Sequence, residues 1–162
     1  MQSKQKEKVF KYLYYHGKKG LVFVILFLGI FIFFSVNFVS AFSGTGNGSL
    51  ANPYDITNCT PLQEMRDDLS AHYQLVGNIN CSETSEWNSG AGFEPIGIDI
   101  SGQRFNGKFN GNGFNINNLL IDKESDYVGL FGAVGASGYI NNVTLVYPSI
   151  NGLERVGALF GK

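Results

Sequence analysis

Two short groups of acidic residues and one pair of cysteines are the side chains in this sequence that could carry chemistry. The acidic groups are Glu83 with Glu86, and Asp122 with Glu124 and Asp126. Clustered carboxylates can cleave polysaccharides by donating and accepting protons. The second group lies in a polar stretch between apolar repeats, where charges are normally solvated. We therefore predict no catalytic residue in this chain.

The patterns typical of metal and nucleophile chemistry do not occur in the sequence. There is no His-Glu-x-x-His pattern and no Gly-Gly-x-Gly-x-Asp calcium pattern. Of the two histidines, His16 precedes an apolar segment and His72 is expected at the exposed end of a helix, so the serines lack a base. We predict no metal site, no cofactor-binding site and no cofactor.

Cys59 and Cys81 are the two cysteines, and their chemistry depends on where the chain resides. In an exported chain, two cysteines most simply form a disulfide. This bond would close a loop of about 22 residues around a helix and stabilise the fold by about 3 kcal/mol in the loop-entropy model. Two free thiols are the alternative.

The start of the chain indicates export. Six lysines precede an apolar run from Leu21 to Phe34, and small residues follow, ending at Ala41. These features predict a secretory signal over residues 1–41 with cleavage after Ala41. The alternative is an uncleaved membrane anchor at residues 21–39, which would span about 28 Å as a helix at about 1.5 Å per residue. In both cases the remaining chain is extracellular or at the cell surface.

The charges are divided unevenly between the start and the remainder of the chain. Residues 1–20 hold six lysines and one acid, whereas residues 43–162 hold six bases and twelve acids. An acidic body lacks the concentrated basic face that nucleic-acid binding requires. We exclude nucleic acid as a partner. The membrane is a partner through residues 21–39 if that segment is not cleaved.

Small polar residues at positions 42–52 predict a flexible linker. Residues 53–92 are predicted to form an N-terminal cap that contains a helix at residues 61–71. Thr60 suits the N-cap, Pro61 the first helical position, and Gln63 completes a capping box. The single Trp87, in the polar loop after the helix, is either a lid over the core or a platform for a ligand.

The C-terminal half repeats itself. Phe109, Phe131 and Phe160 recur in glycine-rich segments, and the pattern Ile-Asn-Asn at residues 116–118 recurs at residues 140–142. Such self-similarity, with glycine and asparagine between apolar residues, indicates short stacked strands joined by tight corners. The three phenylalanines are predicted to form one interior ladder.

These repeats predict an all-β fold: a right-handed parallel β-helix, or solenoid, over residues 93–162. The helix-containing disulfide cap would precede it, after the N-terminal hydrophobic signal or anchor helix. Asn118 and Asn142 are predicted to form a stacked pair at one corner. Residues 110–113 also permit a hairpin, because Asn-Gly favours hairpin turns. The last repeat is incomplete, so we expect a C-terminal truncation.

Four sequons for N-glycosylation occur in the sequence. Asn47, Asn58 and Asn80 are predicted as glycosylation sites, with Asn47 the best placed because it lies in the linker. Asn142 also begins a sequon, but we assign it to the corner pair. Asn58 and Asn80 each precede a cysteine, so disulfide formation would compete with their modification.

Two segments resemble the GLUG motif, a short repeat of bacterial and archaeal surface proteins that include adhesin-like proteins. They are Tyr127-Val128-Gly129-Leu130-Phe131-Gly132 and Val156-Gly157-Ala158-Leu159-Phe160-Gly161, the second with an inserted alanine. The upstream segments, from Asn52 onward, resemble the sequence that commonly precedes such repeats. The resemblance implies a β-helical surface module and implies no catalysis.

We predict an exported cell-surface repeat module that serves as an adhesin-like binding or structural stalk. Its expected partners are glycans or other surface proteins. The alternative is the N-terminal part of a secreted polysaccharide-active enzyme or peptidase whose catalytic region lies beyond residue 162.

Overall fold

The computed structural model describes residues 41–162. The predicted signal or anchor, with its apolar run at residues 21–39, lies outside the described residues, so cleavage after Ala41 stays a prediction. Within residues 41–162, no helix has the length and apolar character needed to cross a bilayer.

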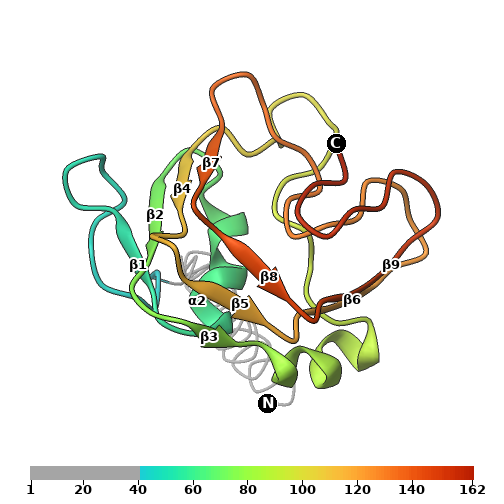
Figure 1. The fold of residues 1–162 in the computed structure, drawn as a ribbon. Coiled ribbons are helices and arrows are strands. Elements are labelled where there is room, and N and C mark those ends of the chain that lie inside the picture. Colours follow the sequence, from blue (N-terminus) through green and yellow to red (C-terminus); the bar gives the residue numbers. More distant parts are fainter. Residues whose placement is uncertain (1–40) are drawn as a thin grey trace, which may run out of the picture. The chain divides into compact units, whose positions relative to one another are not determined.

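Short parallel strands make up most of the regular structure of this unit (Figure 1). The strands are β1 (Tyr54–Ile56), β2 (His72–Leu75), β3 (Ile79–Asn80), β4 (Lys108–Asn110), β5 (Asn115–Asn117), β6 (Leu120–Asp122), β7 (Tyr139–Asn141), β8 (Thr144–Val146) and β9 (Ser149–Asn151). They form three sheets, with the orders β1-β2-β4-β7, β3-β5-β8 and β6-β9. Residues 110–113 connect β4 to β5, which belong to different sheets, so the alternative hairpin does not form there.

The predicted right-handed parallel β-helix over residues 93–162 is wrong. The strands contain two to four residues, they belong to three separate small sheets, and residues 41–162 contain no closed solenoid. The chain between successive strands of one sheet varies in length, since the helical segment η2 (Ser82–Gly90) and the loop at residues 98–104 are inserted. A regular coil would need a constant spacing between its strands.

The predicted helix at residues 61–71 is shorter and begins earlier than expected. The α-helix α2 spans Cys59–Glu64 and continues as the 3-10 helix η1, Met65–Asp67. The predicted N-cap at Thr60, with a capping box to Gln63, is wrong. The N-cap is Asn58, whose side chain accepts a hydrogen bond from the Thr60 backbone N–H at 2.9 Å. The helix ends at Asp68, which is extended because its carboxylate accepts hydrogen bonds from the backbone and hydroxyl of Ser70.

Residues 42–52, predicted as a flexible linker, pack against the sheet instead. The ring of Phe42 lies 4.3 Å from that of Tyr54 and 5.8 Å from that of Tyr73, measured between centroids. The backbone N–H of Asp55 in β1 donates to the Thr45 carbonyl at 2.9 Å. The segment therefore covers the outer edge of β1.

The predicted ladder of Phe109, Phe131 and Phe160 is divided between two rows. Phe109 is in register with Tyr73 and with Ile140, whereas Phe131 is in register with Phe160 through an isolated bridge. The rings of Phe109 and Phe131 are nevertheless neighbours, with centroids 5.7 Å apart. Both are fully buried, whereas Phe160 is 44% exposed. The pairing of the strands determines which side chains lie in one row, and the number of residues between the phenylalanines does not.

Aromatic side chains fill much of the core. Phe105 lies between Tyr73 and Phe131, with centroid distances of 6.3 and 5.1 Å. Burying a side chain of this size stabilises a fold by about 1.5–3 kcal/mol. Trp87 in η2 stacks on the buried Phe93 at 6.4 Å, so its indole covers one end of the core.

The two glycine-rich segments at residues 128–132 and 156–161 lie side by side. Backbone N–H groups of Leu130 and Phe131 donate to the carbonyls of Ala158 and Leu159, at 3.1 and 2.9 Å. A Cβ atom on Gly129 would lie 2.6 Å from the Gly157 carbonyl oxygen. The repeated glycines therefore allow two backbones to approach each other closely.

The predicted disulfide is confirmed: Cys59 at the start of α2 is bonded to Cys81 directly after β3. The Cα atoms are 5.5 Å apart, the cysteines are 22 positions apart in the sequence, and both side chains are fully buried. The bond joins the start of α2 to the chain directly after β3, in the second sheet.

We predict that the Cys59→Ser/Cys81→Ser double variant unfolds with a free energy about 3 kcal/mol lower than the wild type, because its unfolded chain has no closed loop. Urea unfolding followed by circular dichroism measures this difference. A reducing agent should destabilise the wild type by a similar amount and leave the double variant unchanged. Equal unfolding of the oxidised and reduced wild type would contradict the prediction.

Thr84 in η2 provides a second test, because its buried hydroxyl makes two hydrogen bonds. It donates to the Cys81 carbonyl at 2.7 Å and accepts from the Leu120 backbone N–H at 2.9 Å. Thr84→Val keeps the shape but leaves the Leu120 N–H unpaired and removes one of the two hydrogen bonds that the Cys81 carbonyl accepts, so the free energy of unfolding should fall by about 1–3 kcal/mol. Thr84→Ser keeps the hydroxyl and is the matched control. Identical urea midpoints for the two variants would show that these bonds do not stabilise the fold.

Candidate functional site

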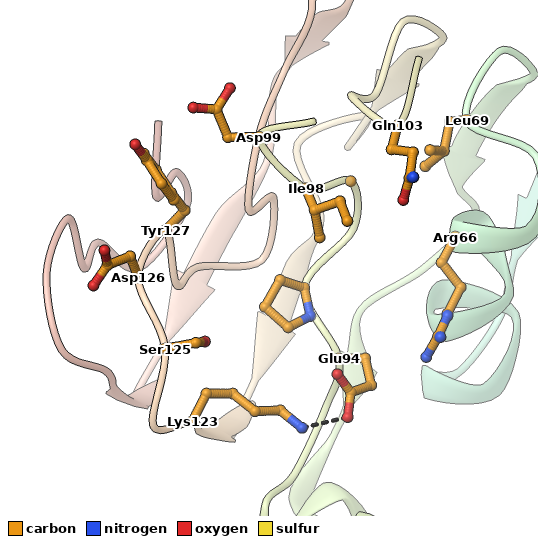
Figure 2. A pocket seen from close by; sticks show the side chains of 12 residues that line it. Arg66, Leu69, Glu94, Ile98, Asp99, Gln103, Lys123, Ser125, Asp126 and Tyr127 are labelled. Atoms are coloured by element: carbon orange, nitrogen blue, oxygen red, sulfur yellow. Dashed lines mark hydrogen bonds and ion pairs between the residues drawn. The ribbon is translucent and has the colours of Figure 1, made fainter. Parts of the chain in front are cut away.

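A cleft with a volume of about 290 Å³ lies beside η1 (Figure 2). Arg66 and Leu69 line one side, and residues 123–127, from the segment after β6, line the other. Between them runs the segment of residues 94–99, with Ile98 facing the space in Figure 2. The volume is near the lower limit for small-molecule pockets.

Gln63 of α2 fixes the position of this central segment. Its side-chain Nε2 donates to the Glu94 carbonyl at 2.9 Å, and its Oε1 accepts from the Glu94 backbone N–H at 2.7 Å. The carboxamide therefore pairs with Glu94 as a neighbouring strand would. One helix side chain thus holds the cleft's backbone in place.

Two acidic residues of the cleft, Glu94 and Asp99, are paired with cations. Lys123 forms an ion pair with Glu94. Asp99 accepts hydrogen bonds from Lys162 Nζ at 2.5 Å and from Arg104 Nε at 2.9 Å. The hydrogen bond from Lys162, together with Arg104, holds the pKa of Asp99 below its ordinary value, against the opposing effect of desolvation. These charges already have partners and serve to position the loops.

Tyr127, at one side of the cleft, is surrounded by cations. The Arg155 guanidinium carbon lies 4.7 Å from the ring centroid, and Lys162 Nζ lies 5.3 Å from it. Such contacts are favourable because the ring face is electron-rich. Tyr127 also has a backbone φ of 60°, which is uncommon for a bulky residue. The Tyr127 ring therefore helps to hold the chain around Arg155 and Lys162 beside the cleft.

The structure brings one of the predicted carboxylate residues to the cleft. Asp126 lies there and accepts a hydrogen bond from the Glu154 backbone N–H at 3.2 Å, whereas Asp122 belongs to β6. Glu83 and Glu86 are exposed on η2. Within residues 41–162, no three His, Cys, Asp or Glu side chains are grouped as metal ligands.

Glu94 and Asp99 are cleft residues that sequence reasoning missed. Glu94 is paired with Lys123, and Asp99 with Lys162, which is 63 positions away in the sequence. No short motif contains either pair. Both pairs form between segments outside the strands, which only the folded structure brings together.

The predicted corner asparagines do not meet. Asn118, with φ of 56°, donates through Nδ2 to Asn80 Oδ1 at 3.0 Å. Asn142, with φ of 51°, lies at another corner, where its carbonyl accepts from the Gly113 N–H at 2.8 Å. The register that pairs Asn80 with Asn117 places the following Asn118 beside Asn80.

The three asparagines predicted to carry glycans are exposed, and each uses its side-chain oxygen locally. Asn47 accepts from the Ser49 N–H at 3.1 Å, Asn58 caps α2, and Asn80 accepts from the Ser82 N–H at 3.2 Å. Their glycosylation stays a prediction.

A second candidate site is the outward side of the four-stranded sheet. Because side chains alternate between the two sides of a strand, the residues beside the buried Tyr73 and Phe109 point away from the core. This surface, called the outer polar face below, consists of Asp55, His72, Gln74, Lys108, Asn110, Tyr139 and Asn141. His72, predicted at a helix end, is the first residue of β2.

The outer polar face contains two rows of side chains across the strands. Gln74, Asn110 and Asn141 continue one row from Asp55, and Gln74 Nε2 donates to Asp55 Oδ1 at 2.8 Å. His72, Lys108 and Tyr139 form the other row. Tyr139 is 58% exposed. The Nδ1 atom of His72 is buried and has no hydrogen-bond partner within the described part of the chain.

The parallel sheets, the buried disulfide and the two surfaces define a small, disulfide-bonded β-sheet module. Its sequence is 40% identical over 122 residues to halomucin from Haloquadratum walsbyi, an overlap of 72% of this chain and 1% of halomucin. It is also 38% identical over 128 residues to a putative Gly-rich membrane protein from Evansella cellulosilytica, an overlap of 75% of this chain and 14% of that protein. The chain thus spans a small part of either relative. No family model and no solved structure matches it, so the GLUG resemblance has no support from a family match.

Asp99 makes the stability of the cleft depend on pH. Because its folded pKa is lowered, its paired carboxylate stabilises the fold fully above the ordinary pKa of 3.8, and this stabilisation is lost as the pH falls through the lowered value. The wild type should therefore melt at a higher temperature than Asp99→Asn at neutral pH, and the difference should shrink towards zero in strong acid.

Thermal melting by circular dichroism from neutral pH to strong acid measures this difference. Asp122→Asn is the matched control, since Asp122 is exposed in β6 and makes no side-chain hydrogen bond within the described residues. A melting difference for Asp99→Asn that stays constant over the whole pH range would refute the assignment.

Proposed function

We propose that this chain is a surface-associated, non-catalytic binding module, adhesin-like in its role, and that its outer polar face binds glycans. The observation that carries the proposal is the composition of that face. It presents carboxamides in one row and an exposed tyrosine in the other, on a sheet whose opposite side is buried.

Carboxamides suit glycans because they both donate and accept hydrogen bonds, as sugar hydroxyls do. Gln74 and Asn110 keep bonding capacity beyond their internal contacts, and the Asn141 side chain makes no hydrogen bond within the described residues. The exposed ring of Tyr139 offers an apolar surface against which a sugar ring packs, and its hydroxyl remains in water. Strands hold these groups at fixed spacing, so little entropy is lost on binding.

The charge of the face favours a neutral glycan. Lys108 is exposed beside His72, and Asp55 lies at the other end of the carboxamide row. The carboxylate of Asp55 is held by Thr45 Oγ1 at 2.5 Å and by Gln74. One cation and one internally bonded carboxylate give no strong preference for an anion or a cation.

Several features support a location at the cell surface. One relative is named a membrane protein. The basic start and the apolar run from Leu21 predict export, and disulfides persist in oxidising compartments. The GLUG-like segments at residues 127–132 and 156–161 point to the same class of surface protein.

The cleft favours a non-catalytic role. Its charged pairs, Lys123 with Glu94 and Asp99 with Lys162, are engaged with each other. Ser125 has no histidine beside it among the cleft residues. A nucleophile needs an adjacent base to react, and the described residues of the cleft do not supply that arrangement.

Binding of the purified protein to a glycan array, followed by calorimetry with the best ligand, tests the proposal. Tyr139→Ala should weaken binding by more than about 1 kcal/mol, as truncation of an aromatic contact residue does. Tyr147→Ala is the matched control, since Tyr147 is a tyrosine with 84% exposure that lies outside the outer polar face. Absence of glycan binding, or equal effects of the two substitutions, would reject the assignment.

A further inference from the structure

The outer polar face is longer across the strands than along them. Its residues come from four neighbouring strands, in the order β1, β2, β4 and β7 (Figure 1). Neighbouring strands lie about 4.8 Å apart, so the face extends about 14 Å across the sheet. Each strand has only three or four residues and contributes at most two outward side chains, which lie about 7 Å apart. A long ligand therefore makes the most contacts when it crosses the strands.

Three carboxamides lie in register along this direction. Gln74 is paired with Asn110, and Asn110 with Asn141, so each of three successive strands carries one carboxamide. The row begins beside Asp55, whose carboxylate is already bonded to Thr45 and Gln74. The carboxamides follow one another at the strand spacing, and the sugar rings of an extended, unbranched glycan follow one another at a similar interval. One sugar unit can therefore lie at each carboxamide.

Two of these carboxamides each use one atom inside the protein and keep the other for a ligand. Gln74 uses Nε2 to bond Asp55, which leaves Oε1 as an acceptor. Asn110 uses Oδ1 to accept from the Asn112 N–H at 3.0 Å, which leaves Nδ2 as a donor. Among the residues that the structure describes, the one buried side-chain nitrogen or oxygen without a partner is Nδ1 of His72. Gln74 Oε1 and Asn110 Nδ2 are therefore accessible to solvent and can bond to sugar hydroxyls.

Tyr139 makes the two ends of the row different. It lies on the same side of β7 as Asn141, two positions earlier in the strand, and it is 58% exposed. The equivalent position beside Gln74 is held by His72, which is only partly exposed. A sugar ring can pack on an exposed aromatic ring. The strongest contact for a single sugar unit is therefore at the Tyr139 end of the row.

We infer that the ligand of the outer polar face is an unbranched, neutral glycan of at least three sugar units that crosses β7, β4 and β2 along the carboxamide row. One unit packs on Tyr139 beside Asn141. The next unit bonds to Asn110 Nδ2, and the third bonds to Gln74 Oε1. This inference rests on the proposed binding of glycans by the outer polar face, and it adds the length and the direction of the ligand.

Calorimetric titration of the purified protein with cello-oligosaccharides of one to six glucose units tests the length of the ligand. These glycans are neutral, unbranched and extended. The association constant should rise by about threefold to tenfold with each unit up to the third, because each unit adds hydrogen bonds to one more strand. It should change by less than about twofold from four units to six. Malto-oligosaccharides, which are equally neutral but curved, are the matched ligands and should gain no affinity with length.

Substitutions of single carboxamides test the direction. Gln74→Ala should weaken the binding of cellotriose by about threefold to tenfold and leave that of cellobiose unchanged, because only the third unit reaches Gln74. Asn110→Ala should weaken the binding of both. Gln103→Ala is the matched control, since Gln103 is an exposed carboxamide of the cleft and lies outside the outer polar face. Thermal melting of each variant ensures that folded proteins are compared.

Three results would overturn the inference. The first is equal affinity for glucose and cellotriose, the second is an equal effect of Gln74→Ala on cellobiose and cellotriose, and the third is no binding of any cello-oligosaccharide. The proposed function survives each of them if another glycan on the array binds and Tyr139→Ala weakens that binding. If no glycan on the array binds, both the inference and the proposed function are rejected.

Discussion

The register between parallel strands is the constraint on which this structure depends. Each strand is only two to four residues long and makes few hydrogen bonds, so a strand is stable only where its central apolar residue lies beside one in the next strand. Tyr73, Phe109 and Ile140 are one such series. Because side chains alternate, the same register brings the polar neighbours of these residues together on the other side of the sheet. The same strand register therefore determines both which residues pack in the core and which residues form the outer polar face.

Local chemistry in the sequence was sufficient for some features. The disulfide followed from two cysteines in a chain that we predict to be exported. A helix was expected close to the position of α2, although its N-cap is Asn58 and not Thr60. The end of that helix did not follow. It was predicted at residue 71, but Asp68 adopts an extended conformation held by Ser70. The carboxamide of Gln63 pairs with Glu94 and not with the start of the helix, and neither this contact nor the bonds between Asp68 and Ser70 could be identified from the sequence.

Features set by distant residues could not be predicted. The phenylalanines recurred at suggestive intervals, but insertions of unequal length assigned Phe109 and Phe131 to different rows. Asn118 was paired in the prediction with Asn142 and in the structure with Asn80. The cleft residues Glu94 and Asp99 belong to pairs that span long stretches of sequence. Each of these errors has the same physical cause, since a repeat interval does not define a register when the intervening loops vary.

The covered edge of β1 gives the sheet a direction. Strands can be added only on the side of β2, then β4, then β7, which is also their order along the chain. A chain that is made from its N-terminus therefore presents each new strand to a partner strand that has already been made. The segment from Phe42 to Asn52 covers the first edge of the sheet. Each later strand therefore pairs on the opposite edge, with a strand that precedes it in the chain.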